Sequence, residues 1–273
     1  MPEKPEVITV SNSLKSRIVG QVITDCNVYW DNIIAYPTTD EFKKKIIGQK
    51  IQDVNTRGKF IRIILDRDVL LIHLRMEGKF FFRKKCEPIV KHEHVEFILN
   101  NTISFRYHDV RKFGKMYLID KEKVDNVKPL SELGLEFDDT KLTKEYLYDK
   151  IHSKRLPIKT VLLDQSIITG IGNIYDDEIL FRCGISPYRK ACDVTLLECN
   201  EIIKNTLIVL SEAIKKGGTT IKSFTSSEGV HGLFQNELLV HGKKNDKCPI
   251  CSSKIEVCRI GGRGTYYCYK CQK

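Results

Sequence analysis

The first hydrophobic pattern along the chain predicts a helix. Apolar residues recur with a spacing near 3.6 residues between Val7 and Val19, and Gly20 follows as a helix stop. Alternating, β-branched stretches come next, with turn residues between them. The predicted strands are 60–65, 69–74, 95–99 and 102–105. The first 120 residues are therefore expected to form one helix followed by a β-sandwich or barrel.

The pattern changes in the second half of the chain, where helices are expected to dominate. Residues 121–150 are rich in charge, weakly periodic and contain a proline, as expected of a linker or hinge. Two short helices are predicted at 159–165 and 174–183. A longer amphipathic helix follows, with a Thr-x-x-Glu capping box at its start and Gly217-Gly218 as its stop.

Composition places the chain among ordinary globular proteins. Its 273 residues are 41% hydrophobic and 29% charged, which excludes a wholly disordered, collagen-like or membrane-embedded chain and suggests two domains. No apolar stretch approaches the roughly 18 residues of a membrane-spanning helix. The N-terminus lacks the apolar region of a signal peptide, so a soluble protein of the cytosol is expected.

The net charge of +10, from 45 Lys and Arg against 35 Asp and Glu, indicates a polyanionic partner. Nucleic acid is the first candidate, and an acidic membrane surface is the second. A surface that is basic only for solubility explains the charge equally well. The charge alone leaves these alternatives open.

The cysteines point more strongly to one chemistry. Without an export signal they are expected to be reduced, so their spacing indicates metal binding before disulfides. Four of the ten follow the pattern Cys-x2-Cys-x16-Cys-x2-Cys of a four-thiolate zinc site: Cys248, Cys251, Cys268 and Cys271. Such a site is closed, so one structural Zn²⁺ is expected. A zinc-binding hairpin suits DNA binding and also suits a protein–protein module.

Residues 2–6, with the sequence Pro-Glu-Lys-Pro-Glu, have two interpretations. Proline and acidic residues suit the start of a helix for steric and dipole reasons. Removal of Met1 would also expose Pro2 as a secondary amine, a nucleophile able to form a Schiff base with a sugar carbon. Glu3 beside it has the chemistry of a general acid or base. On these residues alone, the start of a helix is the favoured interpretation.

Seven short motifs in sequence order make the chain resemble the formamidopyrimidine-DNA glycosylase family, bifunctional bacterial enzymes that remove oxidised purines. The motifs are Pro2–Val7, Thr56–Phe60, His73–Gly78, Asp109–Gly114, Gly170–Tyr175, Phe234–Leu238 and Gly261–Thr265. Each motif is weak alone, but seven in order are not expected by chance. The resemblance covers essentially the whole chain.

The resemblance implies an α+β multidomain fold. Its expected parts are a catalytic N-terminal helix and β-sandwich at 1–120, a linker or hinge at 121–150, a helix–two-turn–helix domain at 151–234 and a zinc-binding β-hairpin at 235–273. Double-stranded DNA containing damaged bases would be the partner, bound by a monomer. The expected activity is that of a DNA glycosylase and abasic-site lyase in base-excision repair.

The resemblance also implies roles for the N-terminal residues. Pro2 would attack C1′ of the damaged nucleotide, the base would leave, and β- and then δ-elimination would cut both sides of the abasic site. Glu3 would move protons at the sugar, and Glu6 would orient the start of the helix. Lys59 would hold a phosphate beside the lesion, although without the family a solvated hairpin lysine would be the preferred interpretation.

DNA contacts follow from the same resemblance. Three residues match family positions that hold phosphates around the flipped nucleotide: His73, Asn173 and Arg263. Three others match residues that fill the space it leaves: Met76, Arg111 and Phe113. Taken alone, Met76 and Phe113 are more often core residues. For Asn173, a core or capping role is the alternative. The His-Leu-x-Met-x-Gly pattern favours oxidised purines, because the pyrimidine-specific relative endonuclease VIII lacks it.

Three features depart from the family pattern. Lys4 stands where leucine is usual, and would either put charge near Pro2 or face solvent. His241 stands where the family usually has a tyrosine that touches phosphate, so its contact would depend on pH. Residues 217–232 match the loop that closes on the flipped base, with a generic sequence. An endonuclease VIII-like glycosylase and a non-catalytic DNA-binding zinc protein remain the alternatives.

Overall fold

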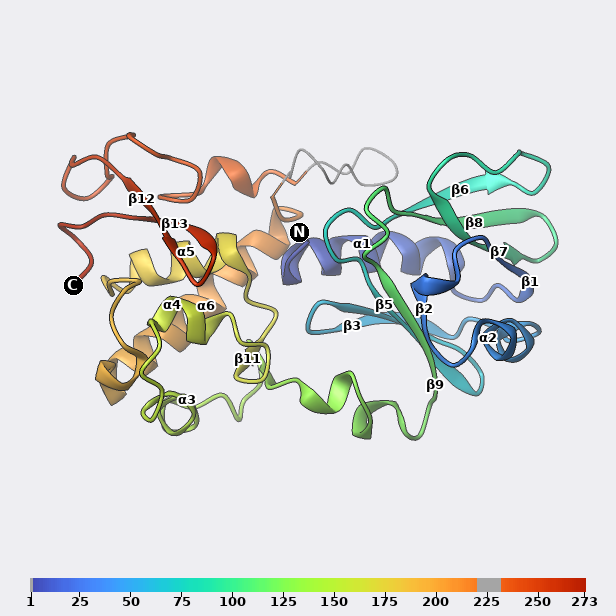
Figure 1. Cartoon of the computed structure of the whole chain (residues 1–273), viewed down its shortest axis with the longest axis horizontal. Helices are drawn as coiled ribbons and strands as arrows, with labels where there is room; N and C mark the ends of the chain where they lie inside the picture. The colour runs from blue at the N-terminus through green and yellow to red at the C-terminus, as the bar shows by residue number, and fades with distance from the viewer. Residues whose placement is uncertain (1, 220–231) are drawn as a thin grey trace. The chain divides into compact units, whose positions relative to one another are not determined.

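The strand-rich and helix-rich halves of the sequence form two units in the computed structural model, which describes residues 2–219 and 232–273 (Figure 1). The first unit comprises Met1–Ser131 and Gly217–Gly232, and the second comprises Glu132–Lys216 and Leu233–Lys273. Met1 and most of the predicted base-covering loop lie outside the described residues. The predicted domain boundaries at 120, 150 and 234 stay predictions.

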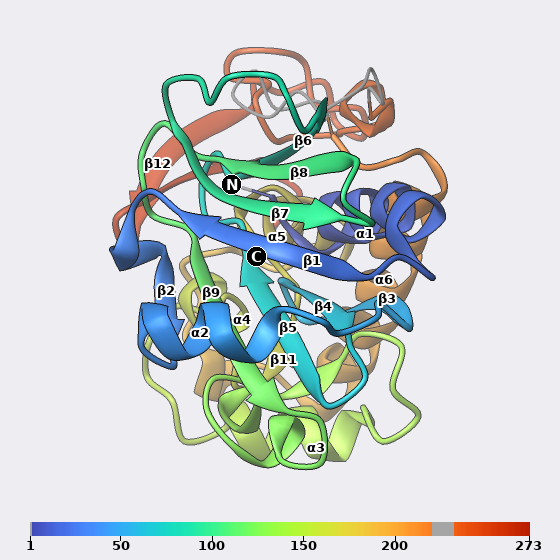
Figure 2. The same cartoon turned by 90° about the vertical axis from the view of Figure 1, so that its right-hand side faces the viewer.

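The first unit combines one long helix with two sheets (Figure 2). One sheet has the order β1-β7-β8-β6, with strands β1 (Ile23–Val28), β7 (Glu93–Leu99), β8 (Ile103–His108) and β6 (Lys79–Lys84). The other has the order β2-β9-β5-β4-β3, with strands β2 (Ile34–Tyr36), β9 (Lys115–Asp120), β5 (Asp68–His73), β4 (Phe60–Ile64) and β3 (Asp53–Arg57). Its helices and 3-10 turns are α1 (Lys4–Ile18), η1 (Asp31–Ile33), α2 (Thr39–Ile46) and η2 (Val124–Asn126).

Helix α1 and both sheets share one hydrophobic core. The helix buries Val7, Leu14 and Ile18 against residues of both sheets, among them Ile61 and Phe97. The helix ends before Gly20, whose positive φ of 86° an L-residue adopts at a cost. The predicted helix, the β-sandwich and the four predicted strands are therefore confirmed.

Two loops connect the sheets at one edge of this unit, and they are called the interstrand loops here. Residues 74–78 run from β5 to β6, and residues 109–114 return from β8 to β9. The register places the strand ends together, because His73 pairs with Lys115 and Lys79 pairs with His108. The β3–β4 turn lies at the same edge, since Phe60 pairs with His73.

The second unit is mainly helical. Its elements are β10 (Leu135–Glu136), α3 (Lys144–Ile151), α4 (Ile158–Leu162), β11 (Ile168–Thr169), α5 (Asn173–Arg182), η4 (Ala191–Asp193), α6 (Leu196–Lys215), η5 (Phe234–Asn236), β12 (Glu256–Ile260) and β13 (Arg263–Tyr267), and η3 (Leu130–Glu132) precedes them. The predicted linker at 121–150 contains η2, η3, β10 and most of α3.

Two helices of the second unit test the sequence patterns. Helix α6 starts at the predicted capping box, in which Thr195 and Glu198 satisfy each other's backbone N–H groups. Helix α4 is shorter than predicted, because Asp164 accepts hydrogen bonds from the backbone and hydroxyl of Ser166 and so begins a turn. Among the described residues, no helix is both long and apolar enough to cross a membrane.

The C-terminal hairpin packs on helix α5 through a small core of its own. Phe181 at the end of α5 is buried with Val240, Ile255, Cys248 and Cys268. The last residues bind back to the helix end, since the N–H of Ser186 donates to the carbonyl of Lys273. The predicted C-terminal hairpin is confirmed, and it belongs to the second unit.

Candidate active site and nucleic-acid interface

The start of α1 is buried and held by a carboxylate. Pro2 and Glu3 are both buried, and the N–H of Glu3 donates to Oε2 of Glu6 at 2.9 Å. The other oxygen of Glu6 accepts the N–H and the hydroxyl of Thr219, at 2.8 and 3.1 Å. A Cβ on Gly218 would lie 2.5 Å from that oxygen, so a glycine is required there. Glu6 thus ties the first turn of α1 to the first residues of the predicted base-covering loop.

Lys4 does not face solvent, so that alternative is wrong. Its side chain is buried, and Nζ donates to Oγ1 of Thr56 in β3 at 3.1 Å. Thr56 lies three residues before Lys59 on the same hairpin. The chain therefore links its N-terminal segment to the hairpin that carries Lys59.

Lys59 is also buried, at 6% exposure, so the solvated hairpin lysine is wrong. It follows Gly58 in the β3–β4 turn, where a positive φ of 54° favours glycine. The next residue, Phe60, meets His73 edge to face with the ring centroids 4.8 Å apart. The structure thus brings Lys59 and His73 to one edge of the sheet.

His73 is held as a neutral imidazole. Burial, followed by the positive charges of Arg75 and Lys59, lowers its pKa from 6.5 to about 3. Its Nδ1 accepts the N–H of Arg75 at 3.0 Å, so the ring proton resides on Nε2. His73 can therefore donate a hydrogen bond to an anion without carrying charge.

The interstrand loops present the three predicted space-filling residues. Arg111 and Phe113 are exposed, with the guanidinium 4.7 Å from the ring centroid, and Met76 is half-buried. The core interpretation of Met76 and Phe113 is therefore wrong. A cavity of about 540 Å³ lies here, and its lining residues are Arg75, Met76, Arg111, Lys112, Phe113 and Lys115. Four of these six side chains are cationic, which suits an anionic occupant.

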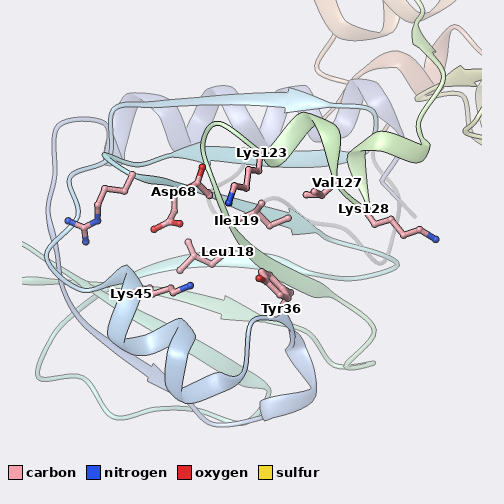
Figure 3. A pocket seen from close by; sticks show the side chains of 10 residues that line it. Tyr36, Lys45, Asp68, Leu118, Ile119, Lys123, Val127 and Lys128 are labelled. Carbon is pink, nitrogen blue, oxygen red and sulfur yellow. The ribbon is translucent and has the colours of Figure 1, made fainter.

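A separate cavity of about 650 Å³ lies at the opposite end of β5 and β9 (Figure 3). Asp68 and Asp120, which pair at that end of the two strands, both line it, together with Lys45 from α2. It contains none of the predicted site residues. The candidate site therefore lies at the edge marked by His73.

In the second unit, Asn173 and the hairpin turn come together. Asn173 is the first residue of α5, and its Nδ2 donates to the carbonyl of Gly264 at 2.9 Å. Its Oδ1 is buried and has no hydrogen-bond partner among the described residues. Arg263, next to Gly264, is exposed at the start of β13. The helix N-terminus and the arginine thus occupy one small region of this unit.

His241 lies beside the same hairpin. Its Nδ1 is 2.7 Å from Oδ2 of Asp177, and its ring contacts Tyr266 with the centroids 4.9 Å apart. Asp177 also accepts from the buried ammonium of Lys159 at 2.6 Å and from the N–H of Tyr266 at 3.3 Å. Because Asp177 accepts from Lys159 and Tyr266 as well, His241 donates to it from Nδ1, and Nε2 is the ring nitrogen left for another partner.

Sequence reasoning missed the buried carboxylates that hold these segments. Glu178 accepts the backbone N–H groups of residues 239–241 at 2.7 to 2.9 Å. The sequence contains a signal for this role of Glu178, because three consecutive acidic residues at 176–178 interrupt an otherwise apolar helix. Asp109 lies in a recognised motif, but its role as a backbone acceptor was not predicted.

The four predicted ligand cysteines meet at one point. All four Sγ atoms lie within 4.8 Å of one another, with Cys248 and Cys271 at 3.8 Å and Cys251 and Cys268 at 3.5 Å. Tetrahedral zinc with bonds of about 2.3 Å requires sulfur–sulfur distances of about 3.8 Å. The cysteines are free thiols and fit a metal ion. Cys258 stands outside the group and is half-buried.

Family models match both units of the chain. The model described as "Formamidopyrimidine-DNA glycosylase N-terminal domain" matches residues 1–116. The model described as "Formamidopyrimidine-DNA glycosylase H2TH domain" matches residues 133–225. Together they cover most of the described helices and strands.

Individual relatives match over the full length. A formamidopyrimidine-DNA glycosylase of Bacillus cereus is 42% identical over 273 residues, which is 100% of this chain and 99% of the relative. The Lactococcus lactis enzyme in complex with abasic-site DNA superposes with a TM-score of 0.92 at 33% identity, with both chains fully covered. The same wild-type enzyme bound to DNA with an oxidised pyrimidine gives a TM-score of 0.91 at 33% identity and equal coverage. The chain belongs to the formamidopyrimidine-DNA glycosylase family.

Proposed function

We propose that this protein is a base-excision repair enzyme that removes oxidised purines such as 8-oxoguanine and formamidopyrimidines from duplex DNA and then cleaves the abasic site. The observation that carries this proposal is the buried start of α1. There Pro2 and Glu3 stand on a helix turn fixed by Glu6, and Lys4 reaches the hairpin that holds Lys59. In this proposal the enzyme acts as a monomer in the bacterial cytosol, on the DNA of the nucleoid.

The proposed chemistry begins at the amine of Pro2 after Met1 is removed. The nitrogen forms a bond to C1′ while the glycosidic bond breaks, and the base leaves with a proton. Loss of the sugar ring C–O bond gives an iminium, which acidifies the C2′ proton. β-Elimination then expels the 3′ phosphate and δ-elimination the 5′ phosphate. Glu3 is the acid and base that moves these protons.

The other predicted residues hold the DNA. Lys59 and the neutral Nε2–H of His73 hold phosphates beside the lesion at the edge of the sheet. Met76, Arg111 and Phe113 fill the space of the flipped nucleotide, with Arg111 on the orphaned cytosine. In the second unit, the remaining phosphate contacts come from Asn173, His241 and Arg263.

The cysteine group holds one structural Zn²⁺ in this proposal. Four thiolates leave no open coordination position, so the ion stabilises the hairpin and takes no part in the reaction. Metal analysis should find one zinc per chain. Cys268→Ser should lower both the zinc content and the affinity for DNA, whereas Cys258→Ser is the matched control. Wild-type DNA affinity in a zinc-free Cys268→Ser protein would contradict a role for the hairpin in binding.

Borohydride trapping tests the catalytic proposal. Met1-processed protein is incubated with a duplex carrying 8-oxoguanine opposite cytosine, and reduction should give a covalent protein–DNA adduct. Pro2→Gly should lose most of this adduct, and protein that retains Met1 should form none, because the secondary amine is then absent. If Met1-processed wild-type protein forms no covalent adduct, the proposed enzymatic activity is refuted. A non-catalytic DNA-binding zinc protein would then be favoured.

A second substrate distinguishes a glycosylase for oxidised purines from an endonuclease VIII-like glycosylase for oxidised pyrimidines. The Lactococcus lactis relative has been solved with an oxidised pyrimidine in its DNA, which makes pyrimidine lesions a specific alternative. Single-turnover excision of 8-oxoguanine opposite cytosine should be faster than excision of thymine glycol opposite adenine. The reverse order would favour an endonuclease VIII-like specificity.

A further inference from the structure

The interstrand loops share a buried support that the proposed mechanism does not use. Asp109 is fully buried at the start of the second loop. Its Oδ1 accepts the N–H of Arg111 at 3.0 Å, and its Oδ2 accepts those of Phe113 and Gly114 at 2.9 and 2.8 Å. One carboxylate therefore holds the backbone of the two residues that the loop presents.

This support is needed because both loops are strained. Lys112 has a φ of +57° and Arg75 a φ of +54°, in the left-handed region that residues other than glycine rarely adopt. Each strained residue stands next to a predicted DNA contact. Strain of this kind persists only where the surrounding structure holds it, and Asp109 binds N–H groups on both sides of Lys112.

Tyr107 extends the same support to the first loop. Its ring is fully buried at the end of β8, and its hydroxyl lies 3.4 Å from Oδ2 of Asp109. A Cβ built on Gly78 would lie 2.3 Å from that hydroxyl, and a Cβ on Gly114 only 1.7 Å. The hydroxyl thus fills the space against the final glycine of each loop. Burial and the Asp109 charge raise the pKa of Tyr107, so the phenol keeps its proton and donates to the carboxylate.

We propose that Tyr107 and Asp109 are positioning residues that lock the two interstrand loops into one rigid unit, so that Met76 and the Arg111–Phe113 pair enter DNA in a fixed relative geometry. The consequence is specificity: Arg111 reaches the base opposite the lesion only when both loops keep their register. This inference rests on the proposed function, because it assigns those contacts to DNA.

The structure supplies a reporter that needs no DNA. The ammonium of Lys112 lies 3.7 Å from the ring centroid of Trp30, which is the single tryptophan of the chain. Release of the second loop would remove this cation from the indole. Tryptophan fluorescence and its quenching by iodide therefore report the arrangement of the loop in the free protein.

The test uses Asp109→Asn and Tyr107→Phe in the full-length protein. Asparagine replaces one of the two accepting oxygens of Asp109 by an NH2 donor, and phenylalanine removes only the hydroxyl of Tyr107. Both should change Trp30 fluorescence, and both should reduce the excision preference for 8-oxoguanine opposite cytosine over adenine by about tenfold, the low end expected for a displaced base contact. Adduct formation on a preformed abasic site should persist, which a general loss of folding would not allow.

The matched control is Tyr29→Phe, which removes another phenol that donates to a buried carboxylate in the same unit, Glu96. It should keep the wild-type preference for the opposite base. Wild-type preference in both Asp109→Asn and Tyr107→Phe would overturn the inference, as would unchanged Trp30 fluorescence in both. A wild-type protein that excises nothing would refute the proposed function instead, and the fluorescence result would still decide the loop arrangement.

Discussion

Two segments of this protein are held in the same chemical way and differ in where their support comes from. In the first unit, Asp109 accepts the N–H groups of residues two, four and five positions onward. In the second unit, Glu178 accepts three N–H groups from residues 61 to 63 positions onward. Each carboxylate is buried and takes three backbone donors.

The difference decides what each carboxylate stabilises. Asp109 shapes a loop out of its own neighbours, so its bonds set local geometry at an exposed tip. Glu178 joins residues 239–241 to helix α5, and Val240 in that segment packs in the small core with Cys248 and Cys268. Glu178 therefore stabilises the attachment of the hairpin, and Asp109 the shape of a contact surface.

The largest expected effect tests this division directly. Glu178→Ala should lower the free energy of unfolding by about 3–5 kcal/mol, because several buried N–H groups lose a charged acceptor. Asp109→Ala should cost less, about 1–3 kcal/mol, since its three donors belong to one neighbouring loop and its loss detaches no separate core. Urea titrations followed by circular dichroism measure both values. An equal loss in the two variants would contradict the division between attachment and loop geometry.

Acid should destabilise the first interstrand loop. That loop is held by His73, whose Nδ1 accepts the N–H of Arg75, and whose pKa is lowered to about 3. Because the folded state disfavours the proton, this stability is present above about pH 6.5 and is lost as the pH falls toward 3. About 2 kcal/mol should disappear by pH 5.

Two variants check the acid effect by urea titration at pH 7.5 and pH 5. His73→Gln should lack this part of the pH dependence. His152→Gln, which changes a histidine at the end of α3, should keep this pH dependence of the free energy of unfolding. A wild-type stability that is flat over this pH range would show that His73 is not held neutral.

A smaller effect is expected at His241, which lies in the segment that Glu178 holds. Asp177 holds the imidazole through Nδ1 at 2.7 Å, so the ring has a fixed position for a contact with phosphate. His241→Ala should therefore lower the affinity for duplex DNA about fivefold, the value of one lost hydrogen bond. Fluorescence anisotropy measures this affinity, and His152→Ala is the matched control at an exposed position. Unchanged affinity in His241→Ala would show that the ring does not contact DNA.

The smallest effect concerns Lys4, whose Nζ donates to the hydroxyl of Thr56. Lys4→Leu should change the free energy of unfolding by less than about 1 kcal/mol, because an apolar residue of similar size replaces a buried charge at little net cost. Thr56→Val should act in the same direction, and the double variant should be less than additive. Full additivity in urea titrations would show that the two side chains act independently.

Much of the fold was predictable because its signals are local. The 3.6-residue period of α1, the short β-branched and aliphatic runs of β4 and β5 and the capping box of α6 each depend on neighbours within a few residues. The cysteine pattern is local in the same sense, since each Cys-x2-Cys pair forms on one turn. The end of α4 was missed because the competing turn depends on a hydrogen bond from Asp164 that hydrophobic spacing does not contain.

The candidate site was predictable only in part. The motifs identified the interstrand loops and the exposed Arg111, but hydrophobicity alone assigned Met76 and Phe113 to the core and left Lys59 in solvent. Burial depends on which strands become neighbours, and that is decided by sheet register. The roles of Tyr107 and Asp109 depend on two loops from different strands meeting at one hydroxyl.

The sequence by itself therefore determined several helices and strands, among them α1, β4, β5 and α6, together with the zinc-type cysteine spacing and the family, because each follows from residue type and short spacing. Only the tertiary structure decided which charges are buried and what they bind: Lys4 on Thr56, Glu6 on Thr219 and Glu178 on residues 239–241. These partners are separated by 52, 213 and 62 positions. Over such separations the contact is set by packing of the core, which no local pattern encodes.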